Sequence, residues 1–121
     1  MAYKRYVVEF GSGADLHGAD VTKAAKKAVK DAVSHCCLCG LKEILELENM
    51  AAAMKVQVKI GTPKPEEIDK EAVLEMVPFG KREIEVVAGG ISAKGLHVPT
   101  LGAGDDLVIV NAVLTVWIDL P

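Results

Sequence analysis

The alternation of hydrophobic and polar residues predicts four β-strands along the chain. Residues 5–10 alternate first, and residues 54–60 show a clear one-sided pattern in which Val56, Val58 and Ile60 are separated by polar residues. A third alternating stretch covers residues 79–87. Residues 107–119 are hydrophobic at nearly every position, which predicts a strand with apolar side chains on both faces.

Two longer helices and one short helical piece are predicted between these strands. Asp20 is suited to cap a helix over residues 21–36, where hydrophobic residues recur at helical spacing and lysines fill the other face. Gly40 would end this segment, and residues 41–49 add a short helical piece. The second longer helix is expected from Pro65 or Glu66 to about Val77, with acidic residues in its first turn.

The predicted order, β-α-β-α-β-β, indicates an α+β fold in one domain spanning residues 1–121. We expect a two-layer sandwich with a mixed four-stranded sheet, an order that resembles the trimeric chorismate-mutase-like architecture. That resemblance implies a ring of subunits with sites between neighbours. A ferredoxin-like sandwich is the alternative, although its usual order is β-α-β-β-α-β. Because two helices cover only one face of a sheet, we predict a homo-oligomer, a trimer or higher, that covers the other face.

The charge and the length of the hydrophobic runs exclude several classes of partner. The net charge of −3 and the dispersed lysines argue against nucleic acid. The longest hydrophobic run, residues 107–118, is too short to span a membrane. The start of the chain shows no signal peptide, and the cysteines Cys36, Cys37 and Cys39 do not form a secreted disulfide pattern. A cytoplasmic location is therefore expected.

The octapeptide GSGADLHG, residues 11–18, carries the first candidate chemistry. We expect a tight turn between the first strand and the first helix, which would present Asp15 and His17 beside that helix. The stretch lacks the lysine of a phosphate-binding loop and the spacing of a dinucleotide fingerprint. A carboxylate and an imidazole two residues apart could instead bind a divalent metal such as zinc. The alternative is a structural pair, in which Asp15 forms the turn and hydrogen-bonds His17.

A metal site would need a third ligand, for which His35, His97 and the cysteines of SHCCLCG, residues 34–40, are the candidates. The cysteine stretch supplies one cluster without a second ligand pair, so we interpret it mainly as buried packing on the helix. A reactive thiol or a metal ligand is the alternative. His35 is likewise interpreted first as a core histidine and secondly as a metal ligand.

Residues 88–105 form a long glycine-rich segment that predicts a binding loop or a lid. Lys94 and His97 within it could bind an anion or act as acid and base. The alternatives are a solvated loop or a short edge strand around residues 96–98.

Five fixed positions of the octapeptide, Gly11, Gly13, Asp15, His17 and Gly18, follow a G-x-G-x-D-x-H-G pattern. Together with KVQVKIGTPKPEEID, EVVAGGI and the closing hydrophobic strand, this pattern resembles a small family of conserved hypothetical proteins from bacteria and plants. The resemblance covers nearly the whole chain. That family has no assigned function, so the resemblance implies no reaction.

The leading hypothesis is an oligomeric protein that binds a small polar metabolite at a subunit interface. If it is an enzyme, lyase, isomerase or hydrolase chemistry is favoured, because no nucleotide-cofactor fingerprint occurs. The predicted site comprises His17 and Asp15 as catalytic residues and metal ligands, His35 as a further metal ligand, and the ligand-binding residues Gly11, Ser12, Gly13, Gly18, Lys94 and His97. The alternative hypothesis is a non-catalytic ligand-sensing or assembly module.

Overall fold

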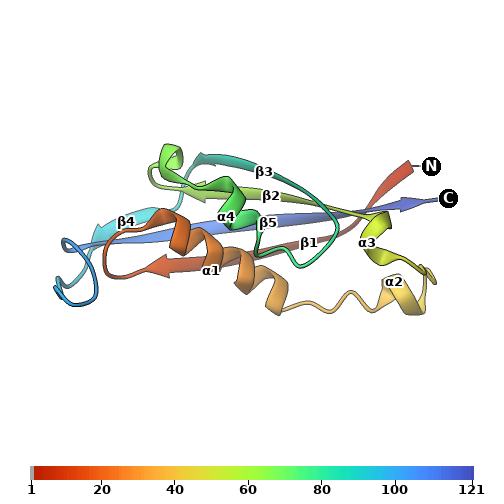
Figure 1. The fold of residues 1–121 in the computed structure, drawn as a ribbon, viewed down its shortest axis with the longest axis horizontal. Helices are drawn as coiled ribbons and strands as arrows, with labels where there is room; N and C mark the ends of the chain where they lie inside the picture. The colour runs from red at the N-terminus through yellow and green to blue at the C-terminus, as the bar shows by residue number, and fades with distance from the viewer. Residues whose placement is uncertain (1) are drawn as a thin grey trace.

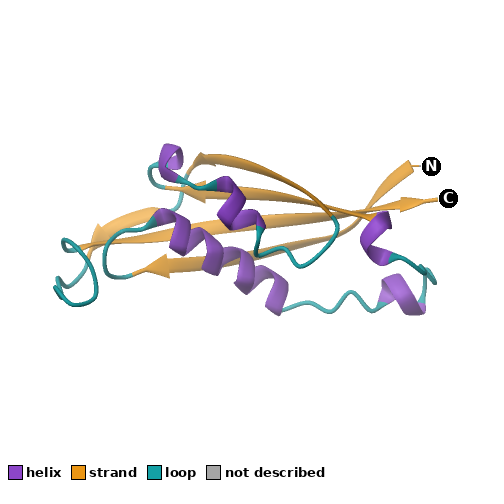
Figure 2. Cartoon of the chain, viewed as in Figure 1, coloured by secondary structure: helices purple, strands orange, loops and turns teal. Residues whose placement is uncertain are grey.

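The computed structural model describes residues 2–121, in which one mixed β-sheet carries helices on one of its faces (Figures 1 and 2). Met1 lies outside the described residues. The elements follow one another as β1 Ala2–Asp15, α1 Val21–Ser34, α2 Gly40–Glu43, α3 Met50–Ala53, β2 Met54–Thr62, the 3-10 helix η1 Pro65–Glu67, α4 Lys70–Leu74, β3 Lys81–Ala88, β4 Ile91–Lys94 and β5 Asp106–Leu120.

The last strand, β5, is the centre of the sheet. The strand order is β1-β5-β2-β3, and the short strand β4 also pairs with β5. β5 is antiparallel to β1, β2 and β4, whereas β2 and β3 are parallel and are connected through η1 and α4. The predicted α+β class with a mixed sheet is confirmed. The sheet has a fifth strand because β4 forms inside the segment that was predicted as a loop.

The core lies between the helices and one face of the sheet. Alternate residues of β5, from Val108 to Ile118, are buried on this face, and Val56, Val58 and Ile60 of β2 lie beside them. Helix α1 covers them with four alanines and two valines that are almost completely buried. The predicted start of this helix is confirmed, since the Asp20 carboxylate accepts the Lys23 backbone N–H at 3.1 Å.

The glycines of the octapeptide are strand residues, so the prediction of a turn beginning at Gly11 was wrong. β1 continues to Asp15, and Gly11 and Gly13 lie on its helix-facing side. A Cβ atom at Gly13 would overlap the backbone of Ala24 and Ala28 in α1, and one at Gly11 would overlap the same helix one turn later. The two glycines therefore allow α1 to lie directly on the strand. The turn itself is shorter and contains Gly18, whose φ is +111°.

Three predicted boundaries also change. The helix expected over residues 65–77 is divided into η1 and α4, because Ile68 is extended and Asp69 starts a new helix by accepting the Ala72 N–H at 3.2 Å. The first helix ends at Ser34 rather than at residue 36. The edge strand considered for residues 96–98 lies at Ile91–Lys94, where β5 supplies backbone partners.

The second face of the sheet is not covered by any element of the described chain. A hydrophobic band runs along it across β1, β5 and β4, in which Val8, Phe10, Val113 and Ile91 are between 41% and 79% exposed. Register pairs Phe10 with Val113 and Ile91 with Ile109, so these residues are neighbours on the open face. Among residues 2–121, no helix is long and apolar enough to cross a membrane.

Candidate functional site

Asp15, at the end of β1, closes the connection to α1. Its side chain is buried, with only 4% of the residue exposed. One carboxylate oxygen accepts the backbone N–H of Asp20 at 2.8 Å, and the other lies 3.9 Å from the Lys23 ammonium. Asp15 thus positions Asp20, which in turn caps the helix. The carboxylate is engaged in organising the strand-to-helix connection.

His17 lies against the long segment that follows β4. Its Nδ1 is 3.3 Å from the backbone oxygen of Leu96. Gly102 also packs so closely on the His17 backbone that a Cβ atom there would overlap it. The structure therefore brings the octapeptide and residues 96–102 together. Within residues 2–121, no hydrogen bond joins Asp15 to His17, so the alternative of a hydrogen-bonded structural pair was wrong.

The other predicted ligand-binding residues have partners of their own. The Lys94 ammonium binds the carboxylates of Asp105 at 3.1 Å and Asp106 at 2.7 Å. The hydrogen bonds to these carboxylates, Asp106 first, raise the pKa of Lys94, and Lys94 in turn lowers the pKa of Asp106. The Ser12 N–H donates to Asp31 at 2.9 Å, whereas His97 is exposed on the loop. Lys94 therefore joins the two ends of the β4–β5 connection.

The three predicted metal ligands contact different partners. Asp15 faces Lys23, His17 faces Leu96, and His35 Nε2 lies 3.4 Å from Asp31. Among residues 2–121, no group of three or more His, Cys, Asp or Glu side chains is arranged to hold a metal ion. His35 is also largely exposed, so the interpretation of it as a core histidine was wrong.

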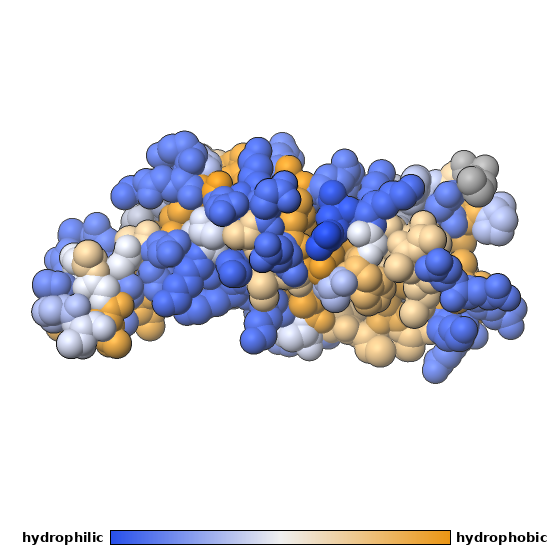
Figure 3. Space-filling model, viewed as in Figure 1, coloured by the Kyte–Doolittle hydropathy of each residue, from blue (hydrophilic) through white to orange (hydrophobic). Residues whose placement is uncertain are grey.

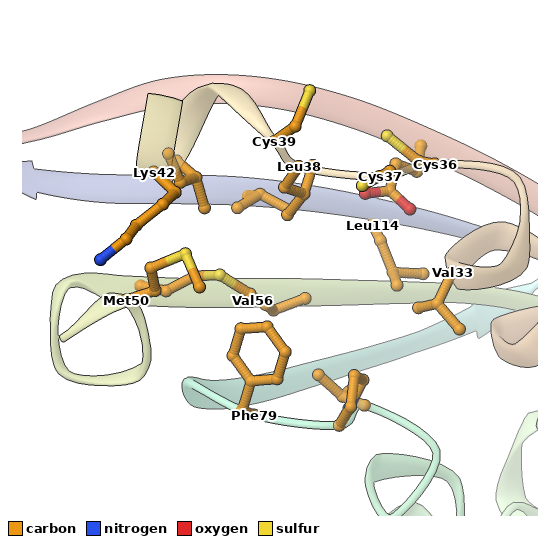
Figure 4. A pocket seen from close by; sticks show the side chains of 16 residues that line it. Val33, Cys36, Cys37, Leu38, Cys39, Lys42, Met50, Val56, Phe79 and Leu114 are labelled. Carbon is orange, nitrogen blue, oxygen red and sulfur yellow. The ribbon is translucent and has the colours of Figure 1, made fainter. Parts of the chain in front are cut away.

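A cavity lies elsewhere, on the helix-bearing side of the sheet between the α1–α2 connection and the α4–β3 connection (Figure 4). Its volume is about 320 Å³, within the range of small-molecule sites. Val33, Leu38, Met50, Val56 and Phe79 point into it in Figure 4. Figure 3 shows hydrophobic side chains gathered on the surface over α2 and α3.

The three cysteines lie at this cavity. Cys36, Cys37 and Cys39 are exposed free thiols in the connection between α1 and α2, and all three line the opening. Their interpretation as buried packing residues was wrong, because α1 ends at Ser34 and the chain leaves the helix before the first cysteine. Thiols at the rim and hydrocarbon side chains on the walls make the cavity almost entirely apolar.

Glu9 is the polar exception within the cavity wall. It lies in β1 on the same face as Gly11, and its Oε2 atom is buried without a hydrogen-bond partner among the described residues. Burial raises the pKa of Glu9, and a hydrogen bond from the Cys36 thiol partly offsets this effect. Desolvation first, and then the Glu9 carboxylate, likewise raise the pKa of the Cys36 thiol. Glu9 therefore lines the cavity and keeps one buried acceptor, Oε2, without a hydrogen-bond partner among the described residues.

Sequence reasoning missed Glu9 because it treated residues 5–10 only as an alternating strand and gave Glu9 no role. The signal was its spacing: Glu9 lies two and four residues before Gly11 and Gly13, so all three residues lie on one face of the strand. If a helix packs against those two glycines, Glu9 lies on the same face of the strand, just beyond the end of that helix. Met50 and Phe79 could not be connected with Glu9 from the sequence, because only the tertiary fold brings them together.

Comparison with known proteins places the chain in a family. A family model described as a conserved hypothetical protein, Lin0512, matches residues 5–116. A crystal structure of an FtsZ-like protein of unknown function from Nostoc punctiforme is 36% identical to this chain. Each chain is covered over 99% of its length, with a TM-score of 0.88. A search of curated proteins found no match. The predicted membership of a conserved hypothetical family is thus confirmed, and the chain belongs to the Lin0512 family.

Proposed function

We propose that this protein is a non-catalytic small-molecule-binding protein and that its ligand occupies the cavity beside Glu9. One observation carries the proposal: Glu9, which lines a mainly apolar cavity of about 320 Å³, keeps a buried carboxylate oxygen without a partner among the described residues. A buried acceptor without a partner costs free energy, and a ligand that donates a hydrogen bond recovers that cost. The cavity thereby combines apolar walls with one orienting polar group, as ligand sites commonly do.

The same features define the chemistry of the ligand. Hydrocarbon and thioether walls select an apolar body, and Met50 and Met54 adapt to its shape. Glu9 selects an N–H or O–H donor at one end of the ligand. The only other charged residue in the lining, Lys42, lies in α2 at the opening. The octapeptide serves this function indirectly, because Asp15 and the two strand glycines fix α1, whose last turn forms part of the cavity wall.

The fluorescent probe N-phenyl-1-naphthylamine, which is apolar and carries one N–H donor, is expected to bind the wild-type protein saturably. Replacing the acceptor in Glu9→Val is expected to weaken its binding about tenfold, the effect of one hydrogen bond to a charged acceptor. Val33→Trp, which fills the cavity from α1, is expected to abolish binding. Fluorescence titration measures all three affinities, and circular dichroism checks that each variant is folded.

Glu48→Val is the matched control, because it removes an exposed carboxylate that does not line the cavity. Its affinity for the probe should equal that of the wild type. Absence of saturable binding to the wild-type protein would contradict the cavity site as a whole. Equal affinity of Glu9→Val and wild type would contradict the role of Glu9 alone.

We further propose that the protein assembles through the open face of its sheet. The supporting observation is the hydrophobic band described above, in which Phe10 is 79% exposed. A side chain of this size on a sheet face is normally covered. The charged residues on the other part of this face pair with one another within the chain. Lys55 pairs with Glu83 and Lys59 with Glu85, each at 3.8 Å.

A second copy of this chain suits such a face best. Its charged rows are neutralised internally, so the face neither repels a copy of itself nor selects a strongly charged partner. The 15 residues of β5 span about 50 Å, and four strands are about 15–20 Å wide, which gives roughly 800 Å². A stable interface of standard size buries about this much on each partner. A dimer satisfies this requirement, and the trimer predicted from the sequence is a second arrangement.

Phe10→Glu is expected to convert the assembly into a monomer, because it places a charge at the centre of the hydrophobic band. Sedimentation velocity over a range of concentrations measures the mass and distinguishes dimer from trimer. Ile44→Glu is the control: Ile44 is also 79% exposed but lies just after α2, on the other side of the sheet. A wild-type protein that remains monomeric at all concentrations would refute assembly through this face.

A further inference from the structure

The exposed side of α1 carries a concentrated positive charge in an acidic protein. Four of its lysines, Lys23, Lys26, Lys27 and Lys30, line a groove of about 370 Å³ beside α4. Their spacings of three and four residues place them on neighbouring turns, where like charges repel one another. The chain as a whole has a net charge of −3, so this concentration is local rather than a consequence of composition. Hydrophilic side chains dominate this region of the surface in Figure 3.

Among residues 2–121, neighbouring acids balance the positive charge only in part. The one acidic residue in the lining, Asp20, is engaged as the cap of α1. Lys23 lies 3.9 Å from Asp15, and Lys27 donates to the Ala14 carbonyl oxygen at 3.1 Å. Within residues 2–121, the side chains of Lys26 and Lys30 form no hydrogen bond or ion pair. Two ammonium groups one helical turn apart therefore remain available to an external anion.

We propose that the groove between α1 and α4 binds a compact phosphate-bearing anion. Ammonium groups on flexible stems bind phosphate as point charges, and two or more of them hold a group with several negative oxygens. The concave shape favours a small anion over a flat surface, because Ala72 and Met76 of the α4 region form the opposite wall. This site lies on the exposed side of α1, apart from the Glu9 cavity, so it is independent of the function proposed above.

Isothermal titration with inorganic pyrophosphate at low ionic strength tests the proposal. Wild-type protein is expected to bind it, and the double variant Lys26→Gln/Lys30→Gln about tenfold more weakly. The control Lys4→Gln/Lys81→Gln removes the same charge from strands β1 and β3, away from the groove, and should bind like the wild type. Lys4, Lys30 and Lys81 are exposed and Lys26 is half-buried, and none of the four lies in the core, so both double variants are expected to fold.

Equal weakening in the two double variants would overturn the site, since it would show a response to net charge alone. Absence of pyrophosphate binding to the wild type would also overturn it. A parallel arm uses vesicles of phosphatidylcholine with and without phosphatidylserine. Binding to the acidic vesicles that depends on Lys26 and Lys30, without pyrophosphate binding, would replace the proposed small anion with a membrane surface.

Discussion

Gly13→Ala is expected to destabilise the protein by about 3 kcal/mol, which is a large share of the stability of a domain of this size. The added Cβ meets the Ala24 carbonyl oxygen and the Ala28 amide nitrogen of α1 at distances that real Cβ atoms do not show. Both neighbours are backbone atoms, so no side chain can rotate away. The helix must move off the strand, and the contacts of its buried alanines are lost. Urea unfolding monitored by circular dichroism at one protein concentration measures the change.

Gly61→Ala is the matched control, because Gly61 also lies within a strand of the same sheet. A Cβ there meets only Gly89 Cα at 3.8 Å and Gly90 N at 3.9 Å, which are ordinary contacts. The free energy of unfolding of Gly61→Ala should stay within about 0.5 kcal/mol of the wild-type value. A small gain is also consistent, because alanine reduces the flexibility of the unfolded chain. A Gly13→Ala variant as stable as Gly61→Ala would show that α1 does not lie directly on β1.

Ile60→Ala is expected to cost about 3 kcal/mol by a different mechanism. Ile60 is completely buried in β2, between β5 and β3, under the helix layer. Truncation removes apolar contacts and leaves a cavity that the surrounding strands cannot close, since their hydrogen bonds hold them in register. The same urea titration measures this loss as a lower midpoint.

Ile91→Ala removes the same atoms from β4 on the open face, where the isoleucine is 61% exposed. In the monomer this change should cost less than about 1 kcal/mol, because little apolar surface returns to water. Both substitutions are made in the Phe10→Glu background and compared at a protein concentration where that protein is monomeric. The comparison then separates the contribution of the core to stability from that of the interface. Equal losses would place the core on the wrong face of the sheet.

Local features of the sequence predicted the elements that depend on local chemistry. The start of α1 follows from the Asp20 cap and from helical spacing, and β2 follows from strict alternation. Gly11 and Gly13 were misinterpreted because glycine favours turns in general, whereas here it removes side chains where α1 meets β1. The sequence pattern that would predict β4 is weak, because this strand is stabilised by pairing with β5 rather than by its own residues.

The candidate site was predictable only in part for the same reason. Asp15 and His17 were identified from their spacing, and the structure gives each of them a contact, although with different partners. The Glu9 cavity depends on residues from β1, the α1–α2 connection, α3 and the approach to β3. Nothing in a linear pattern relates Glu9 to Phe79. The two residues line the same cavity because of how α1 packs on the sheet and of the path that the chain takes after Ser34.

The central position of β5 has a consequence for the order of events during protein synthesis. β5 pairs with β1, β2 and β4, yet it is the last strand to be made. The first strand leaves the ribosome without a strand partner, and α1 has only the glycine face of that strand to cover. The sheet can therefore close only after residues 106–120 have been translated. Until then, β1 and β2 lack the strand that lies between them, and their unpaired backbone edges are accessible to chaperones.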